Sequence, residues 1–190
     1  GAYSKYNGCV AIGKLSSSKG TYGIAIGGQA IIKNSYEYCV AIGNKAYSYQ
    51  TGAVAIGYNS KSGGEDSIAM GYTSTATGFK SIAIGNQSSS SNDNSVAIGS
   101  LSVSSFDNTV AIGHVAKATA TYGVALGDHA YAQQSKSVAL GYRALSDATY
   151  SVAISKAQAK GEKSVAHGYG AYTGAIAKYS VSISKSSATG

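Results

Sequence analysis

The sequence predicts an all-β fold in which short parallel strands stack into a solenoid, and three observations support this prediction. The hexad that ends the stretch Thr51 to Gly57, TGAVAIG, recurs thirteen times in 190 residues. Most copies follow one another at a spacing of fourteen residues. Within each copy large and small side chains alternate, as they do along an extended strand. Repetition at a fixed period indicates equivalent units that share one continuous core.

The hexad predicts the first strand of each repeat. Its third position is β-branched in every copy, from Val10 to Val181, and its fifth is apolar except at His167. Alanine stands between these two positions, apart from Ser182 in the last copy. We expect the large residues to point into the roll and alanine to point outward. The glycine that ends most copies is expected to make a turn that a Cβ atom would obstruct.

The residues after each glycine predict a second, weaker strand. Small residues recur there with period two, as at Ser60 and Ser62 or Ala130 and Ala132. Each fourteen-residue repeat then holds two strands and two turns. We expect a single β-roll domain over residues 1–190, built from about thirteen coils and cut from a longer protein. Between Gly27 and Gly43 the spacing is sixteen, and we expect the insertion, within Ile31 to Tyr38, to bulge outward.

The alanine column predicts self-association. A face almost without long side chains is unnecessary in water but suits a closely packed copy of the same chain. The candidate trimer-interface residues are Ala11, Ala25, Ala41, Ala55, Ala69, Ala83, Ala97, Ala111, Ala125 and Ala139.

Composition excludes several classes of function. The net charge is +7, but the fifteen Lys and Arg residues are scattered, so we expect no nucleic-acid partner. No apolar run approaches the ~20 residues that a membrane-spanning helix needs.

The iterated pattern V-A-I-G followed by small residues at alternate positions resembles the head repeat of YadA-type trimeric autotransporter adhesins of Gram-negative bacteria. The resemblance covers the whole chain. It implies a left-handed parallel β-roll assembled as a homotrimer and displayed on the outer face of the bacterial outer membrane. Neck, stalk and membrane anchor are not seen in this sequence, so attachment to the membrane through an anchor is implied by the family only.

The sequence argues against an enzyme and against a cofactor. The eight acidic residues occupy no fixed column, and Asp128-His129 in a serine-rich chain does not specify a triad. The period of fourteen does not match hexapeptide-repeat acyltransferases, and the threonines do not share the single column expected of ice-binding solenoids. With His114, His129 and His167 as the only histidines, we predict no metal site.

Cys9 and Cys39 occupy one column, two turns apart, which places their α-carbons roughly 10 Å from each other. A disulfide needs less than ~7 Å, so we interpret them as small buried residues. Contact between chains is the alternative.

Recognition is expected in the columns that vary. Apolar residues gather after Gly99, and tyrosines gather around the insertion. Tyrosine offers a large contact area with few rotatable bonds. The receptor-binding candidates are Leu101, Val103, Phe106, Val115, Tyr131, Leu145, Tyr36, Tyr38, Tyr47 and Tyr49. For the apolar group the alternative is packing along the roll or against the next chain, and for the tyrosines it is stacking along the roll.

Together with the resemblance, these observations favour an adhesin head that attaches to a host surface. The resemblance implies collagen, fibronectin or a cell-surface glycoprotein, for example a carcinoembryonic-antigen-related adhesion receptor, as partner. The alternative is a receptor-binding or shaft segment of a phage tail fibre.

Overall fold

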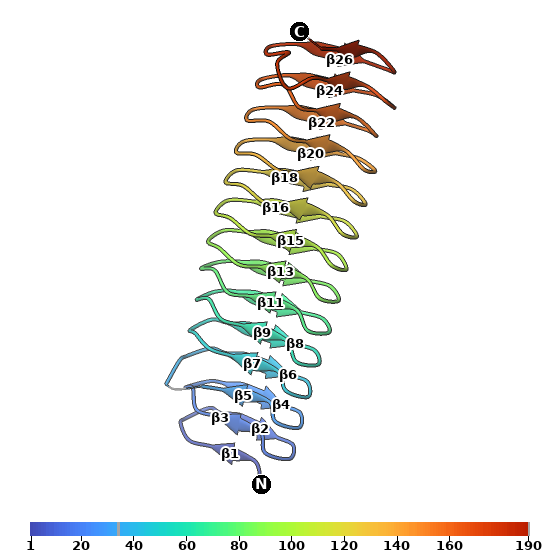
Figure 1. Cartoon of the computed structure of the whole chain (residues 1–190). Coiled ribbons are helices and arrows are strands. Elements are labelled where there is room, and N and C mark those ends of the chain that lie inside the picture. The colour runs from blue at the N-terminus through green and yellow to red at the C-terminus, as the bar shows by residue number, and fades with distance from the viewer. Residues whose placement is uncertain (34, 190) are drawn as a thin grey trace. The chain divides into compact units, whose positions relative to one another are not determined.

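A computed structural model describes residues 1–33 and 35–189, which form an all-β parallel solenoid (Figure 1). Each turn contributes one three-residue strand and one two-residue strand, and thirteen three-residue strands occur in the described residues. The chain divides into two compact units, Gly1–Asn94 and Ser95–Gly190, which are described separately. Asn34, inside the predicted insertion, lies outside the described residues. The single domain predicted from the sequence stays a prediction.

In the first unit the three-residue strands, here called long strands, pair in parallel in chain order, and so do the two-residue, or short, strands. The long strands are β2 Val10–Ile12, β4 Ile24–Ile26, β6 Val40–Ile42, β8 Val54–Ile56, β10 Ile68–Met70 and β12 Ile82–Ile84. The short strands are β1 Tyr3–Ser4, β3 Ser17–Ser18, β5 Ile31–Ile32, β7 Tyr47–Ser48, β9 Lys61–Ser62, β11 Thr75–Ala76 and β13 Ser89–Ser90.

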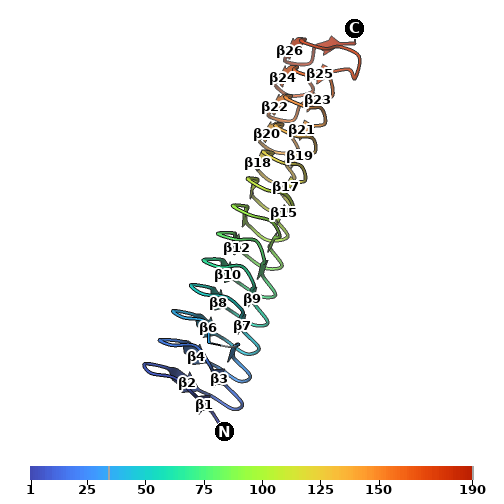
Figure 2. The ribbon, with the colours of Figure 1, turned by 90° about the vertical axis from the view of Figure 1, so that its left-hand side faces the viewer.

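The second unit repeats this arrangement. Its long strands are β14 Val96–Ile98, β16 Val110–Ile112, β18 Val124–Leu126, β20 Val138–Leu140, β22 Val152–Ile154, β24 Val165–His167 and β26 Val181–Ile183. Its short strands are β15 Val103–Ser104, β17 Lys117–Ala118, β19 Tyr131–Ala132, β21 Leu145–Ser146, β23 Gln158–Ala159, β25 Tyr172–Thr173 and β27 Ser187–Ala188. Figure 2 shows the long and short strands of each unit as two separate rows joined by turns.

The long strands bury alanine, which is the opposite of what the sequence analysis expected. Ala55 is fully buried, whereas its neighbours Val54 and Ile56 are only half-buried. The same holds for Ala25, Ala41, Ala69, Ala83, Ala97, Ala111, Ala125 and Ala139, which are also fully buried. Ala11, in the first complete repeat, is half-buried. The fully buried alanines cannot contact another chain, so their assignment to the outer face was wrong.

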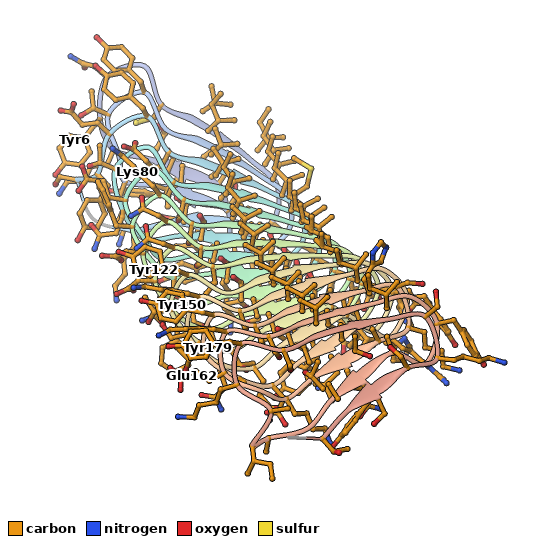
Figure 3. The ribbon with its side chains drawn as sticks, turned by 90° about the horizontal axis from the view of Figure 1, so that it is seen from above. Tyr6, Lys80, Tyr122, Tyr150, Glu162 and Tyr179 are labelled. Atoms are coloured by element: carbon orange, nitrogen blue, oxygen red, sulfur yellow. The ribbon has the colours of Figure 1, made fainter. Side chains whose placement is uncertain are left out.

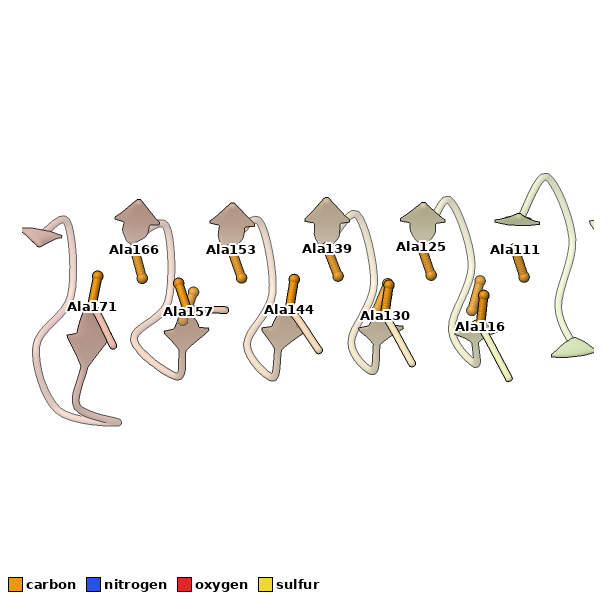
Figure 4. Packing of buried hydrophobic residues seen from close by; sticks show 13 residues of the cluster. Ala111, Ala116, Ala125, Ala130, Ala139, Ala144, Ala153, Ala157, Ala166 and Ala171 are labelled. Atoms are coloured by element: carbon orange, nitrogen blue, oxygen red, sulfur yellow. The ribbon is translucent and has the colours of Figure 1, made fainter. Parts of the chain in front are cut away.

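The narrow interior explains this orientation. Alanine or serine from the long strand faces alanine or serine from the short strand, and both point inward. Figure 4 shows Ala125 and Ala139 projecting toward the side where Ala130 and Ala144 lie. A valine or isoleucine directed into this space from the long strand would meet the side chains of the opposite sheet. The core is therefore built mostly from methyl and hydroxyl groups, and most large apolar side chains lie outside. Ile32 on β5 is the exception, because it is fully buried beside Gly23, which has no side chain.

Buried serines satisfy the backbone at the turns. Ser67 donates to the carbonyl of Gly64 at 2.6 Å, and Ser62 donates to the carbonyl of Ser67 at 2.8 Å. Ser146 and Ser151 repeat this pattern in the second unit, and Ser60 bonds the carbonyl of Gly57. A buried carbonyl without a partner would cost free energy, so these hydroxyls stabilise the roll as well as filling it.

The glycine that ends the hexad has the predicted role. Gly57 has a φ of 128°, and a Cβ atom there would lie 2.3 Å from the carbonyl oxygen of Gly71 in the next turn. Equivalent glycines stack in the same way through each unit, for example Gly113 on Gly127. This stacking confirms the predicted role of these glycines. Near the end of the second unit Ser155 and Ser184 occupy the same position with different backbone angles, at φ values of 66° and 44°.

The insertion lies between β5 and β6. Ile31–Ile32 pairs in register with β3 and β7, so these two residues belong to a regular turn. The ring of Tyr36 packs back against the core, while Tyr38 is exposed and stacks on Tyr22. The insertion therefore does not simply bulge outward.

The two thiols are free, and Cys39 is fully buried. Its Sγ donates to the carbonyl of Gln50 at 3.0 Å, and burial raises the pKa of the thiol. The interpretation of Cys39 as a small core residue is confirmed, and contact between chains at Cys39 is excluded by its burial. Cys9 is half-buried, and its Sγ donates to the carbonyl of Gly20.

Candidate binding surfaces

The outer face of the long strands, here called the long-strand face, is apolar in each unit except at His167 in the second. In the first unit it comprises Val10, Ile12, Ile24, Ile26, Val40, Ile42, Val54, Ile56, Ile68, Met70, Ile82 and Ile84. In the second it comprises Val96, Ile98, Val110, Ile112, Val124, Leu126, Val138, Leu140, Val152, Ile154, Val165, His167, Val181 and Ile183. Parallel pairing in register aligns them in two columns. Apolar surfaces of this extent mark contact sites.

The outer face of the short strands is chemically mixed. Val103, Tyr131 and Leu145 share one outward column of the second unit, as the sequence predicted. Lys117 interrupts the column, because it pairs with Val103 on one side and Tyr131 on the other. The predicted apolar stripe is therefore broken by a charge.

The remaining apolar candidates lie in turns. Leu101 and Val115 occupy equivalent positions of successive turns, and the amide of Val115 bonds the carbonyl of Ser100 at 2.9 Å. Phe106 is exposed in the turn at the other end of its short strand, so it does not join them.

The tyrosines near the insertion divide between two places. Tyr47 and Tyr49 stack with ring centroids 4.0 Å apart, and Tyr49 joins Tyr36 in lining an open groove of about 410 Å³. Lys33, Gln50, Lys61, Gly63, Thr75 and Thr77 complete the lining of this groove, here called the tyrosine groove. Burial and then the neighbouring Tyr47 raise the pKa of Tyr49. Tyr38 lies apart, stacked on Tyr22.

A row of alternating tyrosine and lysine, which the sequence analysis did not identify, runs along one set of turns in the second unit. Its members share a left-handed backbone and are Tyr122, Lys136, Tyr150, Lys163 and Tyr179. Lys136 donates to the Tyr150 hydroxyl at 2.7 Å, and Lys163 donates to that of Tyr179 at 3.0 Å. Figure 3 shows Tyr122, Tyr150 and Tyr179 along one edge, with Glu162 beside Tyr179.

These contacts shift the pKa values of tyrosine and lysine side chains in the row. The hydrogen bond from Lys136 lowers the pKa of Tyr150, and the same bond raises the pKa of Lys136. The ammonium groups also lie over the rings, at 4.7 Å for Lys136 on Tyr150. The row keeps its positive charges at the surface, since every lysine in it is exposed.

The opposite set of turns brings together three groups that can bind a metal. His114, Asp128 and His129 are exposed, and one ligand atom from each lies within 4.8 Å of the others. His114 Nδ1 is 3.3 Å from Asp128 Oδ1, and His129 Nδ1 contacts the same oxygen. The sequence predicted no metal site. The spacing of one period between His114 and Asp128 could have indicated that the two side chains lie on neighbouring turns.

None of the described residues belongs to a helix long and apolar enough to cross a membrane.

The fold and these surfaces together define a repeat protein of the β-solenoid class whose exposed side chains offer broad contact surfaces. A family model, the YadA head domain repeat, matches residues 10–30, 40–60, 62–78, 76–102, 107–130 and 132–154. These segments cover more than half of the chain, so the chain belongs to the YadA head repeat family. The resemblance found in the sequence is thereby confirmed.

One solved structure similar to this chain is the crystal structure of the collagen-binding domain of Yersinia adhesin YadA. The two are 26% identical over 81% of this chain and 69% of the other, with a TM-score of 0.41. No curated protein matches the chain.

Proposed function

We propose that this chain is part of the head of a trimeric bacterial surface adhesin. Membership of the YadA head repeat family supports an adhesin-type head. The apolar long-strand face is the observation that supports assembly as a trimer. Its half-buried valines and isoleucines would leave water if three rolls, each left-handed, pack these faces about a common axis.

Trimer formation through the long-strand face leaves the short-strand face and both sets of turns exposed. These are the parts whose residues vary from turn to turn, and a binding rather than a catalytic role follows from them. Three copies of one site can strengthen a weak contact through effective concentration when their geometry allows simultaneous engagement. The proposed location is the outer surface of the bacterial cell.

We assign ligand contact first to the tyrosine groove. It combines the rings of Tyr36 and Tyr49 with Lys33 and Lys61 in a hollowed surface, and Tyr47 stacks on Tyr49 beside it. Such rings give contact area at low conformational cost. The apolar candidates on β15, β19 and β21 form a second, less continuous patch. The partner class is an extracellular matrix protein, with collagen and fibronectin as first candidates, or a host cell-surface glycoprotein.

A solid-phase screen tests this proposal. The chain is applied to immobilised collagen, fibronectin and a carcinoembryonic-antigen-related receptor ectodomain, with albumin as the control surface. We expect saturable binding to at least one of the three. A chain that is trimeric in solution but binds all three no better than albumin would contradict these partners.

A further inference from the structure

Three side chains with metal-binding chemistry converge on two successive turns of the second unit. His114 follows Gly113 directly, and Asp128-His129 follows Gly127 one period later. The parallel stacking of β16 and β18 brings these two turns side by side. We propose that His114, Asp128 and His129 form a binding site for a divalent first-row transition-metal ion, and zinc is the ion used to test it.

The donor atoms are already close to the required spacing. Bonds of about 2.0–2.2 Å to zinc place neighbouring donors of a tetrahedral site about 3.4 Å apart. His114 Nδ1 and Asp128 Oδ1 are 3.3 Å apart, and His129 Nδ1 contacts the same carboxylate oxygen. The two imidazole rings meet edge to face with centroids 5.4 Å apart. Small rotations of exposed side chains would therefore direct all three donors at one ion.

The backbone that carries these side chains is fixed by the repeat. The amide of His129 donates to the carbonyl of His114 at 2.9 Å, which joins the two turns directly. The amide of Arg143 donates to the carbonyl of Asp128 at 2.9 Å, which joins the second turn to the third. Gly113 and Gly127 pack in contact immediately before the ligands. A site on such a frame loses little conformational freedom when the ion binds.

The local charges suit a cation. The Asp128 carboxylate contacts both imidazole rings through one oxygen, Oδ1, so the anionic ligand of the cluster is shared by the two histidines. The guanidinium of Arg143 lies over the Tyr142 ring, 5.1 Å from its centroid.

The ligand types favour a transition metal over magnesium or calcium. Magnesium and calcium prefer all-oxygen sites, whereas imidazole suits zinc, copper, nickel and iron. Zinc accepts two histidines and one carboxylate and leaves a fourth position for water or a donor group from another molecule. The site is independent of the tyrosine groove, which lies in the first unit.

Histidine NMR signals during titration with zinc chloride test the proposal, because the chain has three histidines and His167 serves as an internal control. After removal of metals with EDTA, we expect the ring signals of His114 and His129 to shift or broaden at one zinc per chain. The signals of His167 should stay unchanged. Equal changes at all three histidines, or none at one equivalent, would overturn the site.

Calorimetry with matched variants gives a second test. We expect His129→Ala, and His114→Ala separately, to weaken zinc binding at least tenfold, while His167→Ala leaves it unchanged. Far-UV circular dichroism checks that each variant keeps the β-solenoid. Zinc affinity in folded His114→Ala with His129→Ala equal to that of the unmodified chain would contradict the proposal. Cobalt in place of zinc should give the visible absorption of a tetrahedral site, and this band should be lost in the same double variant.

Discussion

The two outer faces of the roll differ in how much their residues vary. Along the long-strand face nearly every outward residue is valine, isoleucine or leucine, whereas the outward column of the short strands in the second unit runs Val103, Lys117, Tyr131, Leu145, Gln158 and Tyr172. Both faces belong to the same turns and cover the same core of alanine and serine. Uniform apolar residues suit contact with identical copies of the chain, and varied residues suit contact with something else.

Charges introduced on the long-strand face should have the largest effect of the changes considered, because they should abolish the trimer. Val110→Asp with Val124→Asp places two carboxylates on neighbouring strands of that face, where trimer packing would remove them from water. We expect the trimer to be lost, as measured by sedimentation velocity. Lys117→Asp, on the other face of the same unit, is the matched control and should keep the trimer. If the double variant sediments as the unmodified chain does, the long-strand face is not the contact between chains.

Enlarging an inward residue should have the next largest effect. Ala118 and Lys117 are adjacent on β17, but Ala118 points into the core and Lys117 points outward. Overpacking a full core costs typically about 1–3 kcal/mol, and we expect Ala118→Leu to lie near 3 kcal/mol. Lys117→Leu should change the free energy of unfolding by less than about 0.5 kcal/mol. Urea unfolding measures both, and equal losses would show that the interior is roomier than described.

Ligand contact should respond to the tyrosine groove more than to the apolar patch. We expect Tyr47→Ser with Tyr49→Ser to weaken binding to the ligand found in the screen about tenfold, which corresponds to about 1.4 kcal/mol. Leu101→Asp with Val115→Asp should leave the fold intact and weaken binding by about threefold. Surface plasmon resonance measures both, with thermal unfolding as the control for fold. The reverse order would move the main contact to the second unit.

The smallest effect is expected at two serines of one inward column, which differ in their hydrogen bonds. The Ser67 hydroxyl bonds the carbonyl of Gly64 and the hydroxyl of Ser62, whereas the Ser81 hydroxyl has no partner among the described residues. We expect Ser67→Ala to cost about 1 kcal/mol of unfolding free energy and Ser81→Ala to be close to neutral. Urea unfolding compares the pair. Equal losses would mean that these hydroxyls act by volume alone.

The sequence was sufficient for the all-β parallel solenoid because period, alternation and terminal glycine are local signals. It misled on orientation because large apolar residues were assumed to form the core. Ser62 and Ala69 show why this fails: the small residues of both strands of one turn face each other, and no room remains for Ile68. Ile68 then lies outside, where a second copy of the chain could cover it.

The turns were harder to predict than the strands. The row that contains Lys136, Tyr150 and Lys163 was not predicted, because ligand-binding residues were expected in the columns after each glycine. His114 and Asp128 share a column, but their approach depends on side-chain rotamers that a repeat pattern does not specify. Tyr47 and Tyr49 were identified correctly as neighbours, while the groove beside them required the position of Tyr36 after the insertion.

The central claim is that the long-strand face holds three chains together, and the solution mass of the unmodified chain tests it most directly. Sedimentation equilibrium at micromolar concentration should give three times the 19.1 kDa of one chain. A stable monomer of 19.1 kDa under the same conditions would contradict the claim.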